Sequence, residues 1–262
     1  HAHLTRLDFA IGSAGLMRQS LTLALRHGTT REAFGRPLAE QPMMTNVLAD
    51  LAVEVEASTL MALRVARATD HLAASEHERC LARVATPAAK YFNCTRAPAV
   101  VSEALQCHGG NGFIEESPIA SLFRESALNS VWEGTANMMC MDVRRALLRD
   151  PRHIEGLFDE VAPLLGQDRR FDGLVQLTDE LIRQARTSEF YARPMTEAIA
   201  RMLQGSELLR HSTQDVIAIF LATRTPAASG AWGANFGTLG GAPGTAIHEA
   251  QAAAVVRRAT VV

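Results

Sequence analysis

Apolar residues recur at intervals of three and four along the first 150 residues, which is the spacing of one face of an α-helix. This pattern lies at residues 7–25, 42–65, 81–105 and 138–147. Pro42 opens the second stretch, and the third follows Ser75. No alternation of apolar and polar residues competes with the helical period. The pattern therefore predicts an all-α fold, with four long helices in an antiparallel bundle.

The pattern of apolar residues changes after Asp150 and Pro151. The helical patches become shorter, and they lead into the glycine-rich stretch TPAASGAWGANFGTLGGAPG. We therefore predict two domains, a bundle over residues 1–149 and a smaller helical extension with a loop-rich tail over residues 150–262. Trp232 and Phe236 lie among the glycines of the tail, and we expect them to anchor it against a helical surface.

Charge and composition exclude several classes of protein. The formal net charge is −2, and both halves of the chain are close to neutral, so a nucleic-acid site would have to be a local patch. The four cysteines form no Cys-x-x-Cys pair, and no His-Glu-x-x-His motif is present, so we expect no metal site and a reducing, cytoplasmic location. No apolar run is long enough to cross a membrane. Because the chain begins with histidine and enters a helical pattern at once, we expect a piece of a longer protein.

Three short motifs are ambiguous when each is taken alone. In NSVWEGTAN, Ser130 and Glu133 have the spacing of a capping box, but Glu133 could equally be a catalytic base. The glycines of QCHGGNGF are typical of a turn that ends a helix, and no strand precedes them as in a dinucleotide-binding fingerprint. REAFGRP by itself indicates a charged loop with glycine at a tight turn.

Together, the three motifs resemble the C-terminal helical domain of the acyl-CoA dehydrogenase family. REAFGRPLAEQP is similar to the arginine and phenylalanine loop of the family, and LQCHGGNGFIEESPIASLFRESALNSVWEGTAN is similar to its second and third motifs without a gap. The resemblance covers residues 4 to about 149. GGNGFIEESP, LFRE, NSVWEGTAN and MCMDVRRAL resemble the AidB-like, alkylation-response branch, whereas the last twenty or so residues depart from it.

The resemblance implies an FAD-dependent α,β-dehydrogenation of an acyl-CoA thioester, with Glu133 at the position of the base. It also implies a family assembly, a homo-oligomer that is a dimer of dimers, and upstream helical and β-domains that are missing from this sequence. The neighbouring carboxylates Glu115, Glu116 and Glu125 stand away from the position of the base, and we expect them to be solvated or paired with arginines such as Arg124. The positions that match FAD contacts of the family are Arg31, Phe34, Gln106, Gly109, Gly110, Thr135 and Asn137.

An alternative function follows from arginines near the end of the fourth apolar stretch. Cations there could simply stabilise the C-terminus of a helix. They could also bind the phosphates of duplex DNA without sequence preference, as the AidB-like branch is associated with DNA protection. In that case the protein is a DNA-binding flavoprotein with vestigial dehydrogenase activity. The arginines concerned are Arg144, Arg145, Arg149 and Arg152.

Overall fold

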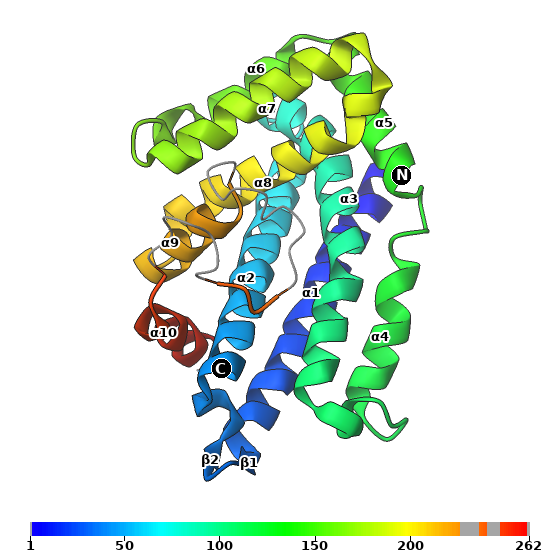
Figure 1. Cartoon of the computed structure of the whole chain (residues 1–262). Coiled ribbons are helices and arrows are strands. Elements are labelled where there is room, and N and C mark those ends of the chain that lie inside the picture. The colour runs from blue at the N-terminus through cyan, green and yellow to red at the C-terminus, as the bar shows by residue number, and fades with distance from the viewer. Residues whose placement is uncertain (1, 226–235, 240–246, 261–262) are drawn as a thin grey trace.

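The computed structural model describes residues 2–225, 236–239 and 247–260, and within these ranges the chain is almost entirely helical (Figure 1). The helices of the first half are α1 (Ala2–Thr30), α2 (Pro42–Asp70), α3 (Glu76–Cys107), α4 (Pro118–Leu128) and α5 (Ala136–Arg149). Those of the second half are α6 (Arg152–Val161), α7 (Arg169–Thr187), α8 (Ala192–His211), α9 (Gln214–Thr223) and α10 (Glu249–Thr260). The all-α fold predicted from the sequence is confirmed.

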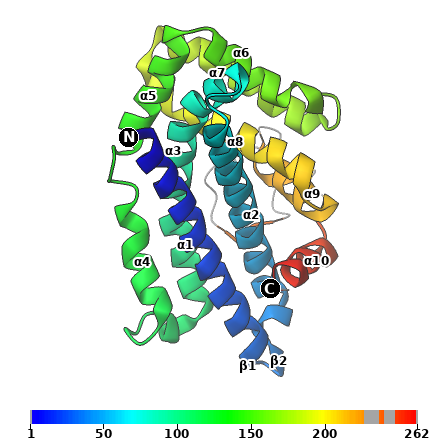
Figure 2. The same cartoon turned by 180° about the vertical axis from the view of Figure 1, so that it is seen from behind.

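A small hairpin joins α1 to α2. Its strands β1 (Glu32–Ala33) and β2 (Arg36–Pro37) are antiparallel, with Ala33 opposite Arg36, and Phe34 and Gly35 form the turn between them. Short 3-10 turns complete the connections; they are η1 (Leu38–Glu40), η2 (Gly109–Gly112), η3 (Ala162–Leu164) and η4 (Glu189–Tyr191). The hairpin and η2 lie at the same end of the bundle (Figures 1 and 2).

The bundle consists of α1, α2, α3 and α4, which run alternately up and down (Figure 1). The apolar pattern predicts residues 138–147 as the fourth helix of the bundle, and this detail is wrong. Those residues belong to α5, which packs on α3 and α8, whereas α4 packs on α3 and α1. The pattern did not indicate α4 because this eleven-residue helix buries only Ile119, Ala120 and Ser126, too few positions to form a recognisable stripe.

The helix ends follow ordinary capping chemistry. Pro42 occupies the first turn of α2, where its missing N–H costs no hydrogen bond. The hydroxyl of Ser75 accepts a hydrogen bond from the backbone N–H of Glu78 at 3.3 Å and caps α3. In the extension, the carboxylate of Asp168 caps α7 in the same way through the N–H of Arg170, at 2.8 Å.

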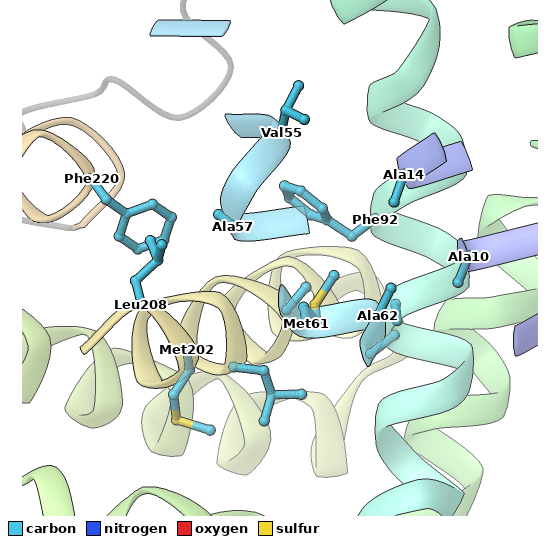
Figure 3. Packing of buried hydrophobic residues seen from close by; sticks show 14 of the residues in the cluster. Ala10, Ala14, Val55, Ala57, Met61, Ala62, Phe92, Met202, Leu208 and Phe220 are labelled. Carbon is cyan, nitrogen blue, oxygen red and sulfur yellow. The ribbon is translucent and has the colours of Figure 1, made fainter. Parts of the chain in front are cut away.

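One continuous hydrophobic cluster joins the bundle to the extension. Figure 3 shows Ala10 and Ala14 of α1 close to α3, and Phe92 of α3 beside Val55 of α2. Small side chains at the α1–α3 contact allow the two helices to approach closely. The cluster continues through α8 and α9, and none of the described helices has the length and the apolar character of a membrane-spanning segment.

The tail packs against the bundle where the structure describes it. Phe236 is buried, and the guanidinium carbon of Arg96 lies 4.2 Å from the centre of its ring. The anchoring role expected for Phe236 is therefore confirmed, while Trp232 lies outside the described residues. Near the C-terminus, α10 packs on α2 and α1.

Candidate active site

The turn between α4 and α5 carries Glu133. The side chain is exposed, and the backbone of Glu133 has a φ of 53°, followed by Gly134 at 103°. The φ of Gly134 lies where residues with a β-carbon are strained, so glycine is favoured there. For a residue with a β-carbon, the left-handed conformation of Glu133 costs roughly 1–3 kcal/mol.

Two cations hold this turn. The guanidinium Nε of Arg6 donates to the carbonyl oxygen of Glu133 at 3.3 Å, and the ammonium of Lys90 donates to the carbonyl oxygen of Gly134 at 2.6 Å. Arg6 also binds the buried carboxylate of Asp142 at 2.7 Å, and Arg83 binds that carboxylate at 2.8 Å. The backbone of the Glu133 turn is thus held by Arg6 of α1 and Lys90 of α3, and Asp142 of α5 holds Arg6 in turn.

The capping-box interpretation of Glu133 is wrong. The hydroxyl of Ser130 donates to the carbonyl of Ala127 at 2.7 Å, at the end of α4. Helix α5 begins at Ala136 with Thr135 as its N-cap residue, so Glu133 stands outside the helix. Within the described residues, no hydrogen bond joins Ser130 to Glu133.

A second group of expected site residues lines a pocket between the ends of α1 and α3. The pocket has a volume of about 430 Å³, and Arg31, Gln106, Gly109 and Gly110 all line it. A β-carbon at Gly109 or Gly110 would meet open space, so a ligand can approach the backbone closely there. The fold thus brings Arg31 together with Gln106, Gly109 and Gly110, which are distant from it in the sequence. The remaining lining residues are His27, Leu38, Cys107, His108 and Asn111.

Phe34 lies at the tip of the hairpin beside this end of the bundle. Its side chain is 96% exposed, and its backbone has a φ of 54°, with Gly35 at 82°. Within the described residues, Phe34 and Glu133 are the non-glycine residues with positive φ. Both coincide with positions singled out in the sequence analysis, and strained backbone of this kind is enriched at functional sites.

Thr135 and Asn137 lie with Glu133, and not with the pocket. Both are exposed at the start of α5, and the amide oxygen of Asn137 accepts a hydrogen bond from Arg193 at 3.1 Å. Arg6, which contacts the Glu133 turn, lies near the start of α1, whereas Arg31 follows its end, roughly 35 Å along the helix axis. Figures 1 and 2 show the start of α1 beside α5 at one end of the bundle and the hairpin of β1 and β2 at the other end.

The four arginines of the DNA-binding alternative have different environments. Arg144 donates to the carbonyl of Ala185 at 2.6 Å and caps the end of α7. Arg152 pairs with Asp150 at 2.6 Å and with Glu76 at 3.0 Å. Arg145 and Arg149 are exposed, and Arg145 lies 3.9 Å from Asp142. DNA binding stays a prediction, with Arg145 and Arg149 as the side chains most available to phosphate.

Several residues of these two sites were missed by the sequence analysis. Lys90, the single lysine of the chain, was not predicted as a site residue, and neither were Arg6, His27 and His108. The available signal was a lysine within an apolar helical stripe. A buried ammonium needs a hydrogen-bond partner, so such a lysine indicates a polar contact elsewhere in the fold. The expectation for Glu115 is confirmed, since its carboxylate pairs with Arg124 at 2.9 Å.

The fold and the two sites define a class of protein. The chain belongs to the acyl-CoA dehydrogenase family, and the family described as "Acyl-CoA dehydrogenase, C-terminal domain" matches residues 2–148. Among curated relatives, the putative acyl-CoA dehydrogenase AidB of Escherichia coli is 37% identical over 80% of this chain. Acyl-CoA dehydrogenase family member 11 of Caenorhabditis elegans is 27% identical over 82% of it.

Solved structures agree with this assignment. The Caenorhabditis elegans protein ACDH-11 in complex with C11-CoA has a TM-score of 0.74 at 25% identity, over 84% of this chain and 42% of that one. An acyl-CoA dehydrogenase of Bacillus anthracis complexed with FAD has a TM-score of 0.68 at 15% identity, which shows a shared fold, over 84% of this chain and 46% of that one. The chain spans 38% of the AidB relative and 39% of the family member 11 relative.

Proposed function

We propose that this chain is part of an FAD-dependent acyl-CoA dehydrogenase in which Glu133 removes the α-proton of the acyl-CoA thioester. The observation that carries this proposal is the turn of Glu133. It presents an exposed carboxylate from a strained backbone whose carbonyl groups are held by Arg6 and Lys90. A general base must stand within hydrogen-bond reach of its proton, and such a tethered turn limits the directions that the carboxylate can take.

The residues of the pocket suit the phosphate groups of FAD. Arg31 offers a guanidinium fork, and Gly109 and Gly110 leave space beside the backbone. Bound FAD would supply the acceptor for the hydride that leaves the β-carbon of the substrate. Gln106 would contact the adenosine end, Phe34 would pack against the dinucleotide, and Thr135 and Asn137 would contact FAD near Glu133.

The separation of the two sites supports a shared active site. We place the pocket of one chain and the Glu133 turn of another at the same FAD molecule, because the two lie far apart within one chain. This arrangement requires at least a homodimer, and the family resemblance extends it to a dimer of dimers. The four free cysteines, all buried, fit the cytoplasmic location that we propose.

The test uses protein of the length of its relatives, loaded with FAD and mixed with acyl-CoA without oxygen. Glu133→Gln keeps the size of the side chain but removes the base, so we expect bound flavin whose bleaching by acyl-CoA slows by at least about 10²-fold. Glu125→Gln, which changes an exposed carboxylate on α4, is the matched control and should bleach like the unchanged protein. Equal bleaching in the Glu133 variant would refute the role of this residue.

A further inference from the structure

The pocket between the ends of α1 and α3 contains more side chains able to bind an anion than Arg31 alone. His27 and His108 also line it, and its described lining contains no carboxylate. The two imidazole rings are stacked, with centres 4.8 Å apart and planes at 29°. Two imidazoles and a guanidinium around one cavity are the side chains expected at a site for an anion.

Hydrogen bonding determines which nitrogen of His108 carries the proton in the neutral ring. Its Nδ1 lies 2.8 Å from the carbonyl oxygen of Ala104. Because a carbonyl oxygen only accepts hydrogen bonds, Nδ1 carries the proton, and Nε2 is the nitrogen that gains one when the ring becomes charged. Burial lowers the pKa of His27, and His108 and Arg31 lower it further, so His27 is neutral at pH 7 when no anion is bound.

No other charged group near the pair places a negative charge in the described lining of the pocket. Burial raises the pKa of the Cys107 thiol to about 12, so it stays uncharged. Glu103 lies one turn back on α3, where its carboxylate accepts a hydrogen bond from the amide of Gln106 at 3.4 Å. Burial raises the pKa of Glu103, and Asp50 of α2 adds to this effect. Arg26, Glu32 and Glu40, which are charged residues of the flanking α1, β1 and η1, do not line the pocket.

We propose that His27 and His108 are phosphate-binding residues that, with Arg31, take up a proton when the diphosphate of a dinucleotide enters this pocket. The identification of the ligand as a dinucleotide rests on the function proposed above, whereas the anion site rests on the pocket itself. An anion between the rings and Arg31 stabilises an imidazolium that is unfavourable in its absence. Repulsion between two stacked imidazolium rings limits the uptake to about one proton.

Proton uptake gives the affinity a definite dependence on pH. Protonation is favoured in the bound state and disfavoured in the free state, so affinity rises as pH falls. The change is concentrated around the ordinary titration range of histidine. Uptake of one full proton changes affinity about tenfold per pH unit, so partial uptake across this range corresponds to about tenfold tighter binding at pH 6 than at pH 7.5.

ADP-ribose is the main probe, because its diphosphate keeps the same charge between pH 5.5 and 8 and it has no flavin ring. Sulfate, also a fixed dianion, is the second probe. Binding to this chain is measured by titration calorimetry at pH 6 and pH 7.5, and the histidine pKa values are followed by NMR with and without probe. We expect about tenfold tighter binding of ADP-ribose at pH 6, with raised pKa values for His27 and His108 in the complex.

Variants assign the effect to the pair. His27→Gln and His108→Gln should each reduce the pH dependence of binding, while Arg31→Ala should weaken binding at both pH values. The matched control is His71→Gln, because Nδ1 of His71 also lies 2.8 Å from a carbonyl one turn back, that of Arg67, but His71 is exposed and outside the pocket. It should bind like the unchanged chain at both pH values.

The outcomes separate this proposal from the proposed function. Binding of ADP-ribose that is equally tight at both pH values would overturn the role of the histidines and leave the FAD assignment standing. Tighter sulfate binding at pH 6, without any preference for ADP-ribose, would support the proton-linked anion site and contradict the dinucleotide. If neither probe binds, and neither histidine pKa moves at millimolar probe, both proposals for the pocket are wrong.

Discussion

A single buried lysine shows how one side chain can define a turn that is distant in sequence. Lys90 is the one lysine among 26 basic residues, and its side chain is 1% exposed. Its ammonium hydrogen-bonds to the carbonyl of Gly134, next to the strained Glu133. Burial lowers the pKa of Lys90 and the charge of Arg6 lowers it further, while Cys94 and Glu133 act in the opposite direction.

Lys90→Met keeps the aliphatic chain but removes the donor, which leaves the carbonyl of Gly134 without this partner. We expect the free energy of unfolding in urea to fall by about 1–3 kcal/mol. The pKa of Lys90 is lowered in the folded chain, so the unfolded chain binds more protons between that lowered pKa and the ordinary lysine pKa of 10.5. Stability of the unchanged chain therefore rises with pH in this window relative to the variant.

The measurement is urea unfolding of both proteins at several pH values from 7 to about 10, the upper end of the lysine titration range. The matched control is Arg67→Met, which changes an exposed cation on α2 and should stay within about 0.5 kcal/mol of the unchanged chain. A stability difference between the Lys90 variant and the unchanged chain that narrows as pH rises would contradict the lowered pKa of Lys90 in the folded chain.

Only part of the candidate site could be predicted from the sequence. Sequence reasoning selected Glu133, Arg31, Gln106 and the glycines because each lies in a recognisable local motif. It could not connect Arg6 or Lys90 to the Glu133 turn, because these hydrogen bonds join residues 127 and 44 positions apart. Contacts of this kind depend on the packing of α1 and α3 against the turn, which no local spacing encodes.

At the scale of elements, buried charges join the extension to α2. Glu54, which is 0% exposed, lies 3.1 Å from Arg201 of α8 and 3.2 Å from Arg224 at the end of α9. Asp50, one turn earlier, pairs with Arg224 and accepts a hydrogen bond from the N–H of Gly237 at 2.9 Å. One turn of α2 therefore holds α8, α9 and the described part of the tail.

Asp50→Asn tests this connection. The substitution leaves Arg224 buried with less negative charge around it, and breaking a buried pair in this way costs about 3–5 kcal/mol of unfolding free energy. Thermal and urea unfolding of the chain measure the loss. Asp159→Asn, at an exposed position on α6, is the control and should change stability by less than about 0.5 kcal/mol.

Acid provides a second measurement on the same network. Burial alone would raise the pKa of Glu54, but Arg201, Arg96 and Arg224 hold it below its usual range. Stability from this carboxylate is therefore present above the ordinary glutamate pKa of 4.5 and is lost as pH falls below it. An Asp50 variant as stable as the unchanged chain would show that the pairs with Arg224 contribute little.

The sequence pattern predicted some helices much better than others. The long stripes of α1, α2 and α3 were predicted because each buries apolar residues over many turns. Helix α4 was missed because its buried positions are few, and α8 was seen only as a patch although it is buried on most sides. A helix surrounded by other helices shows no polar face, so periodicity alone cannot reveal its role.

At the scale of the whole molecule, the bundle and the extension share one hydrophobic cluster. Helix α8 packs across both α2 and α3, and α10 covers part of α2. We propose that residues 1–149 and 150–262 are distinct in sequence pattern but depend on each other for stability. The extension would then hold in place the helices that carry the candidate active site.

A chain ending at Arg149 tests this dependence. Truncation exposes the apolar surface of α2 and α3 that α8 covers, and it leaves the carboxylate of Glu54 without Arg201. Both changes lower the free energy of unfolding. We expect the truncated chain to lose its cooperative thermal transition and to bind a hydrophobic dye, whereas a chain lacking only Val261 and Val262 should unfold like the full one. If residues 1–149 unfold in one sharp transition at the temperature of the full chain, the bundle is an independent domain and the extension serves another purpose.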